Sequence, residues 1–208
     1  KSVVHTHADA ILSLTNTNKY ASIIPKALGG SIIIVPYMLP GFELSKKVSK
    51  ALDAKKNATG LILVNHGLIT WGDTMEKAYS NHIEVVTRAE QFINNNSNQP
   101  TRPQTNNRLD KTKLIAEISP HIRGLISKNI GSILTFNQDD KVIVFSNKEN
   151  AENLIKVGAA TPDHLMHSKR YPLFIKSNHE YELQQLELDI EKGMDKYTQE
   201  YTEWFSKH

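Results

Sequence analysis

Three histidines carry the clearest chemical signal in this 208-residue chain. His5 and His7 end one short apolar stretch, and His66 ends another about sixty residues later. Imidazole nitrogens suit zinc and similar divalent ions, and three protein ligands leave one position open for water or substrate. Cysteine is absent, which excludes thiolate ligands and a disulfide framework. The spacing therefore predicts a Zn²⁺ site, or a site for another divalent metal, of the catalytic kind.

Two strands are needed to position these side chains. Both apolar stretches are rich in β-forming residues, which predicts buried strands. Because side chains alternate along a strand, His5 and His7 should share one face while Thr6 points to the other. Gly67 follows His66 directly and would permit a sharp turn or a close approach of the backbone. A histidine at a strand end can also be a simple polar cap, so the motif alone leaves that alternative open.

Composition restricts the class of protein. Hydrophobic residues make up 39% and charged residues 23%, as in globular proteins. A net charge of +3 is too small and too dispersed to indicate nucleic-acid binding. No apolar run approaches the roughly 20 residues of a membrane span, and no secretory signal opens the chain. We therefore expect a cytoplasmic protein with neither a nucleic-acid nor a membrane partner.

Apolar periodicity predicts the remaining elements and a boundary between two parts. The first part, residues 1–93, should hold the metal site, and the polar stretch 94–107 should be a linker or loop. Residues 108–208 should form an additional α+β lobe with a long helical tail. The predicted strands are 2–7, 31–35, 61–66, 68–71 and 173–175, with a hairpin of 133–136 and 142–145. The predicted helices are 8–14, 42–55, 74–93, 110–127, 148–157 and 180–206.

Four stretches of the first part resemble the class II aldolase/adducin family, over about residues 1–92. They are Val3–Ala10, Ala27–Gly30, Val35–Tyr37 and Leu63–Gly72. The resemblance implies an α/β fold, a three-layer α/β/α sandwich around a mixed sheet, with His5, His7 and His66 as metal ligands. It also implies that Asn65 and Gly67 lie where substrate binds.

The segment Gly158–Leu173 extends the likeness to a subgroup of that family. It resembles part of bifunctional proteins in which a rhamnulose-1-phosphate aldolase region is fused to a short-chain (lactaldehyde or alcohol) dehydrogenase. Asp163 and His164 would then face the substrate pocket. A structural alternative stays open, because Thr161 as N-cap followed by Pro162 and Asp163 makes an ordinary helix start.

The activity that the resemblance implies is retro-aldol cleavage of a ketose 1-phosphate, with the metal stabilising the enediolate. The general acid/base of the family lies upstream of its His-x-His motif, so we expect it upstream of Lys1 and the chain to be part of a longer protein. The carboxylates of Glu43, Asp73 and Asp163 have surface or capping explanations. A sugar-phosphate epimerase of the same family and a non-catalytic adducin-like module are the alternatives.

The same resemblance implies a homo-oligomer, and an apolar strip along 180–206 would suit assembly. No G-x-G-x-x-G motif surrounds Gly29 and Gly30, so we expect no dehydrogenase site within these residues. The other histidines are expected at the surface; they are His82, His121, His167, His179 and His208.

Overall fold

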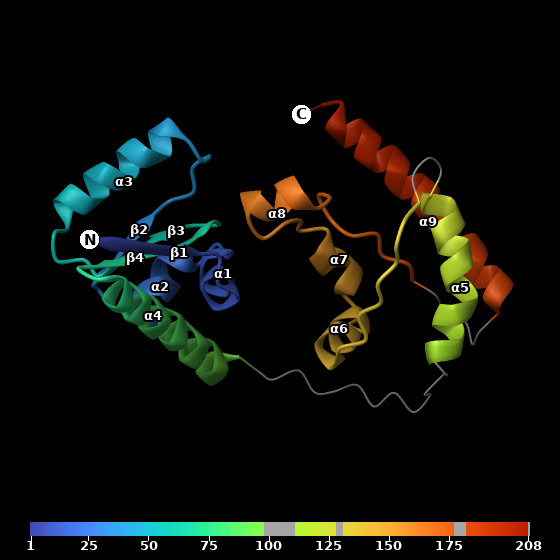
Figure 1. Ribbon diagram of the computed structural model, residues 1–208, viewed down its shortest axis with the longest axis horizontal. Helices are drawn as coiled ribbons and strands as arrows, with labels where there is room; N and C mark the ends of the chain where they lie inside the picture. The colour runs from blue at the N-terminus through green and yellow to red at the C-terminus, as the bar shows by residue number, and fades with distance from the viewer. Residues whose placement is uncertain (98–110, 128–130, 177–181, 208) are drawn as a thin grey trace. The chain divides into compact units, whose positions relative to one another are not determined.

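The computed structural model describes residues 1–97, 111–127, 131–176 and 182–207 (Figure 1). The chain divides into two compact units. The first comprises Lys1–Gln99 together with Ala159–Ser168, and the second comprises Pro100–Gly158 and Lys169–His208. A short segment from the far part of the sequence therefore belongs to the first unit.

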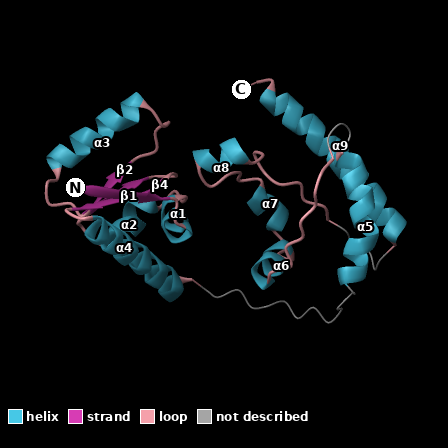
Figure 2. Cartoon of the chain, in the orientation of Figure 1, coloured by secondary structure: helices cyan, strands magenta, loops and turns pink. Residues whose placement is uncertain are grey.

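A four-stranded mixed sheet forms the centre of the first unit (Figure 2). Its strands, in the order β1-β4-β3-β2 across the sheet, are β1 (Ser2–Thr6), β4 (Gly67–Gly72), β3 (Gly60–Leu63) and β2 (Ile32–Val35). β4 runs antiparallel to both β1 and β3, whereas β2 and β3 are parallel. The four strands predicted for this part are confirmed.

Helices cover both faces of this sheet. On one face, α1 (Asp9–Thr15), α2 (Tyr20–Leu28) and α4 (Met75–Asn96) bury a core that includes Ile62 and Leu68. On the other face, α3 (Phe42–Ala54) packs over Leu61, Leu63 and their neighbours. Alternate residues of β3 thus feed two separate cores, as expected for a strand buried on both sides. The three-layer α/β/α fold with a mixed sheet is confirmed.

Among the four helices of this unit that cover the sheet, α4 has a side-chain N-cap. α4 starts after Thr74, whose hydroxyl accepts a hydrogen bond from the Lys77 N–H at 3.1 Å and so caps the helix. α2 is not among the predicted helices, because a proline within a helix normally interrupts it. Pro25 instead lies inside the helix, and its carbonyl accepts the N–H of Gly29, where φ is 72° and the helix ends.

The regular elements of the second unit, among its described residues, are helices. They form α5 (Lys111–Ile126), α6 (Asp140–Ser146), α7 (Ala151–Ile155) and α9 (Leu183–Phe205), and α5 packs against α9. α8 (Pro162–His167) lies in the segment that belongs to the first unit. The predicted helices 110–127 and 180–206 are confirmed, whereas α7 is shorter than the predicted helix 148–157.

The predicted hairpin of 133–136 and 142–145 is wrong. Residues 140–146 form α6, and Asp139 is its N-cap, since the Asp139 carboxylate accepts the Lys141 N–H at 2.8 Å. β propensity needs a partner strand to be expressed, whereas a helix satisfies its hydrogen bonds locally. The strand predicted at 173–175 is also absent, so the described part of this lobe is helical and not α+β.

The predicted linker 94–107 lies mainly outside the described residues, and its first three residues belong to α4. Among the helices of the described residues, none is both long and apolar enough to cross a bilayer.

Candidate metal centre

The sheet brings both histidine stretches to one place. His5 lies on β1, and His7 follows that strand directly. His66 lies in the turn Val64–His66 between β3 and β4. The register pairs His5 with Ile69 of β4, so the end of β1 lies beside the β3–β4 turn. Asn65 adopts φ 57° in this turn, a left-handed conformation that asparagine tolerates better than most residues.

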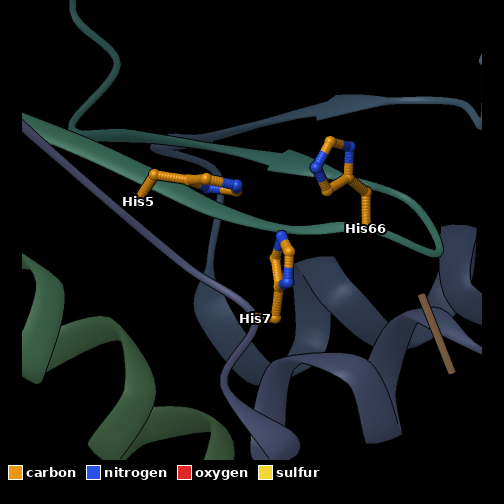
Figure 3. A group of neighbouring side chains, drawn as sticks. All are labelled: His5, His7 and His66. Atoms are coloured by element: carbon orange, nitrogen blue, oxygen red, sulfur yellow. The ribbon is translucent and has the colours of Figure 1, made fainter. Parts of the chain in front are cut away.

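The three imidazoles form a compact cluster (Figure 3). Their ring centroids are 4.9 Å apart for His5 and His7, 5.3 Å for His5 and His66, and 5.1 Å for His7 and His66. One nitrogen from each ring lies within 4.8 Å of the other two. Three nitrogens each about 2.0–2.1 Å from one zinc ion lie at most about 4 Å apart, so small side-chain adjustments suffice for coordination.

Hydrogen bonding leaves nitrogen lone pairs available. The Nδ1 atom of His5 lies 2.8 Å from the carbonyl of Leu68; it can only donate to that oxygen, so Nε2 of the neutral ring carries a lone pair. The Nε2 atom of His7 and the Nδ1 atom of His66 are buried and have no hydrogen-bond partner among the described residues. Buried polar atoms normally have partners, so these two fit a bound cation.

Electrostatics favours the neutral form of two of the rings. Burial lowers the pKa of His7 and His66, and the neighbouring imidazole of His5 lowers both further. Asp163 acts in the opposite direction on both rings. A neutral imidazole is the form that binds a metal, so the lowered pKa values keep the site competent at lower pH.

Gly67 makes the close approach possible. A Cβ atom at this position would lie 2.4 Å from the Thr6 carbonyl oxygen, 2.9 Å from His7 Cδ2 and 3.0 Å from His5 Cε1. No other residue type fits there without movement of the β1 end. The residue predicted to contact substrate therefore has a packing role beneath the imidazoles.

The segment 159–168 packs within the first unit, close enough to the cluster for its charges to act on His7. The side-chain amide of Asn16 donates to the carbonyl of Ala160 at 2.8 Å, and Thr161 is only 4% exposed. The Thr161 hydroxyl accepts the His164 N–H at 3.2 Å, which confirms the predicted N-cap of α8. Asp163 and His164 are exposed on α8, and the charges of both act on the pKa of His7.

Other candidate residues lie elsewhere. Among the described residues, the three histidines form the one group with spacing suited to a metal. Glu43 pairs with Lys46 at 3.2 Å on the surface of α3, and Asp73 is exposed.

Two histidines are less exposed than predicted. His82 is 3% exposed, so its surface assignment is wrong; it lies on the buried face of α4, together with Ala78 and Val85. Its helical spacing from those residues was the signal for burial. His121 is half-buried with its Nε2 atom 3.4 Å from Glu191, whereas His167 is exposed. His179 and His208 lie outside the described residues.

Comparison with known proteins identifies the family of the chain. Residues 1–93 match the family model for the class II aldolase and adducin N-terminal domain, and residues 113–208 match that for the second domain of class II aldolases. The chain belongs to the class II aldolase/adducin family. The segment 159–168 falls in the second family domain by sequence, yet in space it belongs to the first unit.

The chain is also similar in sequence to two individual proteins. The chain is 36% identical over 214 residues to the uncharacterized oxidoreductase YuxG of Bacillus subtilis. The aligned region covers all of this chain and 31% of YuxG. The chain thus spans about a third of that relative. The solved N-terminal class II aldolase domain of a conserved Thermoplasma acidophilum protein is 48% identical, with a TM-score of 0.39 over 44% of this chain and 41% of that one.

Proposed function

We propose that this chain is the metal-binding part of a lyase, a class II aldolase that cleaves a ketose 1-phosphate of the rhamnulose-1-phosphate type. The products would be dihydroxyacetone phosphate and an aldehyde. The observation that carries the proposal is the cluster of three imidazoles with two buried, unpartnered nitrogens, located in the class II aldolase domain.

Each histidine of the cluster would supply one nitrogen ligand to a divalent metal. His5 would bind through Nε2, since its Nδ1–H is held by the Leu68 carbonyl, which also fixes the ring orientation. His7 and His66 would bind through their unpartnered nitrogens. A bound zinc ion would supply Lewis-acid polarisation of the substrate's carbonyl and hydroxyl oxygens.

Substrate contacts are proposed for Asn65, Asp163 and His164, with Gly67 keeping the floor of the site open. The Nδ1 atom of His164 lies 3.1 Å from the Thr161 hydroxyl. If that hydroxyl donates to Nδ1, then Nε2–H of His164 is directed away from the cap and can donate to a substrate oxygen. Thr161 can therefore cap α8 while His164 binds substrate.

The remaining chemistry is assigned outside these 208 residues. We place the general acid/base elsewhere in a longer protein, and we propose that this protein carries a short-chain dehydrogenase, since the relative YuxG is described as an oxidoreductase. Assembly as a homo-oligomer is part of the same proposal.

Elemental analysis tests the metal site. The purified chain should hold about one zinc or other divalent ion, the stoichiometry of a mononuclear site, and a His5→Ala/His7→Ala double variant should hold none. His121→Ala is the matched control, because its half-buried histidine lies in the second unit. A folded wild-type chain without metal would contradict the site and favour a non-catalytic, adducin-like module.

The activity is tested on the longer protein. Rhamnulose 1-phosphate should yield dihydroxyacetone phosphate in the wild type and none in the double variant. Conversion to an epimer without cleavage would replace the aldolase assignment by the epimerase of the same family.

A further inference from the structure

His82 is a buried polar residue that the metal cluster does not use. It lies on α4, on the face that packs against the sheet, and only 3% of it is exposed. A buried imidazole is costly unless its nitrogens are hydrogen-bonded. The partners of His82 therefore show what the residue does.

Both ring nitrogens of His82 have threonine partners. Nε2 lies 2.7 Å from the Thr6 hydroxyl, and Nδ1 lies 3.0 Å from the Thr70 hydroxyl. The Thr70 hydroxyl donates its proton to the Ala78 carbonyl at 3.0 Å, so it must accept from Nδ1–H of His82.

This arrangement determines the tautomer. Burial lowers the pKa of His82, and the neighbouring His5 lowers it further, which favours the neutral form of the ring. With the proton on Nδ1, Nε2 carries the lone pair and accepts from the Thr6 hydroxyl. The Thr6 hydroxyl is therefore the donor of this hydrogen bond. Its acceptor, Nε2 of His82, belongs to a buried ring that is also hydrogen-bonded to Thr70.

Thr6 is the residue between two of the proposed metal ligands. His5 and His7 flank it, and its side chain points to the opposite face of the strand, toward α4. Among the described strands, β1 is at the edge of the sheet and pairs only with β4. An edge strand has fewer backbone restraints, so an anchor at its end decides where the flanking side chains lie.

We propose that His82 is a positioning residue of the metal centre, which holds the backbone between His5 and His7 through the Thr6 hydroxyl. This role rests on the metal site of the proposed function. Loss of an outer partner of a metal ligand typically weakens metal binding by about 10–100-fold. The same range is expected on loss of the Thr6–His82 bond.

Metal affinity of Thr6 variants tests the role. Zinc affinity of the whole chain would be measured by competition with a chromophoric chelator. Thr6→Val, which keeps the shape and removes the hydroxyl, should weaken binding by about tenfold or more. Thr6→Ser, which keeps the hydroxyl, should restore most of the affinity. Thr15→Val is the control, since Thr15 is a fully buried threonine of α1 whose loss should leave zinc affinity unchanged.

A second measurement needs neither metal nor a variant. Nitrogen NMR of the histidine rings in the metal-free wild type should show His82 neutral with its proton on Nδ1. A proton on Nε2, or equal zinc affinity of wild type and Thr6→Val, would overturn the positioning role while leaving the metal site standing. A wild-type chain that binds no zinc would overturn both.

Discussion

At the scale of single residues, the three histidines differ in what holds them. His5 is oriented by a backbone carbonyl, while His7 and His66 each keep a buried nitrogen without a partner. Leaving a buried acceptor unpaired costs about 1–3 kcal/mol. Two such atoms in one cluster of imidazoles are hard to explain as capping, and a shared cation would remove both costs. This is the physical reason to prefer the metal site over the simple polar cap.

Gly67→Ala should damage the metal site without changing any ligand. The added Cβ would overlap the Thr6 carbonyl oxygen and crowd the rings of His5 and His7. We expect a loss of about 1–3 kcal/mol in stability and a zinc affinity at least about tenfold weaker. Urea unfolding and chelator competition measure the two effects.

Gly124→Ala is the matched control for that substitution. Gly124 lies in α5, is exposed, and has no heavy atom within 4 Å of a Cβ built on it. Alanine should therefore stabilise the helix by about 0.5–1 kcal/mol and leave zinc affinity unchanged. If both glycine variants kept full affinity, the close approach at Gly67 would not matter for the site.

Acid should destabilise the metal-free chain. Burial holds the pKa of His7 and His66 below the ordinary value of 6.5. At pH values between the lowered pKa values and 6.5, the unfolded chain binds more protons than the folded chain. The free energy of unfolding therefore increases as the pH rises towards 6.5 and decreases as the pH falls below it. Urea unfolding in chelator, from about pH 5 to pH 7, should show this slope. A His66→Ala variant should show a shallower slope, and parallel curves would contradict the assignment.

At the scale of elements, two short segments matter, the end of β1 and the helix α8. His5 lies within β1, and the strand ends at Thr6, so that His7 follows it and lies beside the β3–β4 turn. α8 is a six-residue helix that begins at the buried cap Thr161 and carries Asp163 and His164. A helix this short depends on its cap, since nucleation is unfavourable and few intrahelical bonds follow.

Thr161→Ala should loosen α8 in particular. Loss of an N-cap hydroxyl typically costs about 1 kcal/mol, or roughly fivefold in the opening equilibrium. Amide exchange of residues 164–168 should accelerate by about that factor, while exchange within β3 stays unchanged. Thr161→Ser should behave like the wild type. Uniform acceleration in both elements would instead indicate global destabilisation.

At the scale of the whole molecule, the division into family domains and the division into compact units differ. The match to the second family domain spans 113–208, yet residues 159–168 are part of the unit that holds the histidines. All three proposed ligands lie in that first unit. Metal binding should therefore stabilise one unit selectively.

The two tryptophans allow that selectivity to be measured, because Trp71 belongs to the first unit and Trp204 to the second. In Trp204→Phe, fluorescence follows the first unit, and in Trp71→Phe it follows the second. Zinc at about 100 times its dissociation constant should stabilise the first unit by about 2.7 kcal/mol and leave the second nearly unchanged. Equal shifts for both reporters would show that the units unfold as one.

Periodicity determined the sheet strands and most helices of the first part, since each of these segments has a continuous apolar face. The alternation that put His5 and His7 on one face and Thr6 on the other was also readable from the chain, and so was the Thr161 cap. Those features depend on neighbours within a few residues, where local geometry decides the outcome. The residue types alone also indicated a metal.

Tertiary structure decided the rest. Only strand pairing brings His66 beside His5 and His7, and only packing shows that Gly67 has no room for a side chain. The buried position of His82 and its bond to Thr6 join α4 to β1 across 76 residues. The apolar run of 142–145 became helix, because its conformation depends on a partner strand that the described fold does not supply. Contacts between distant segments form only when the chain folds, so no local pattern encodes them.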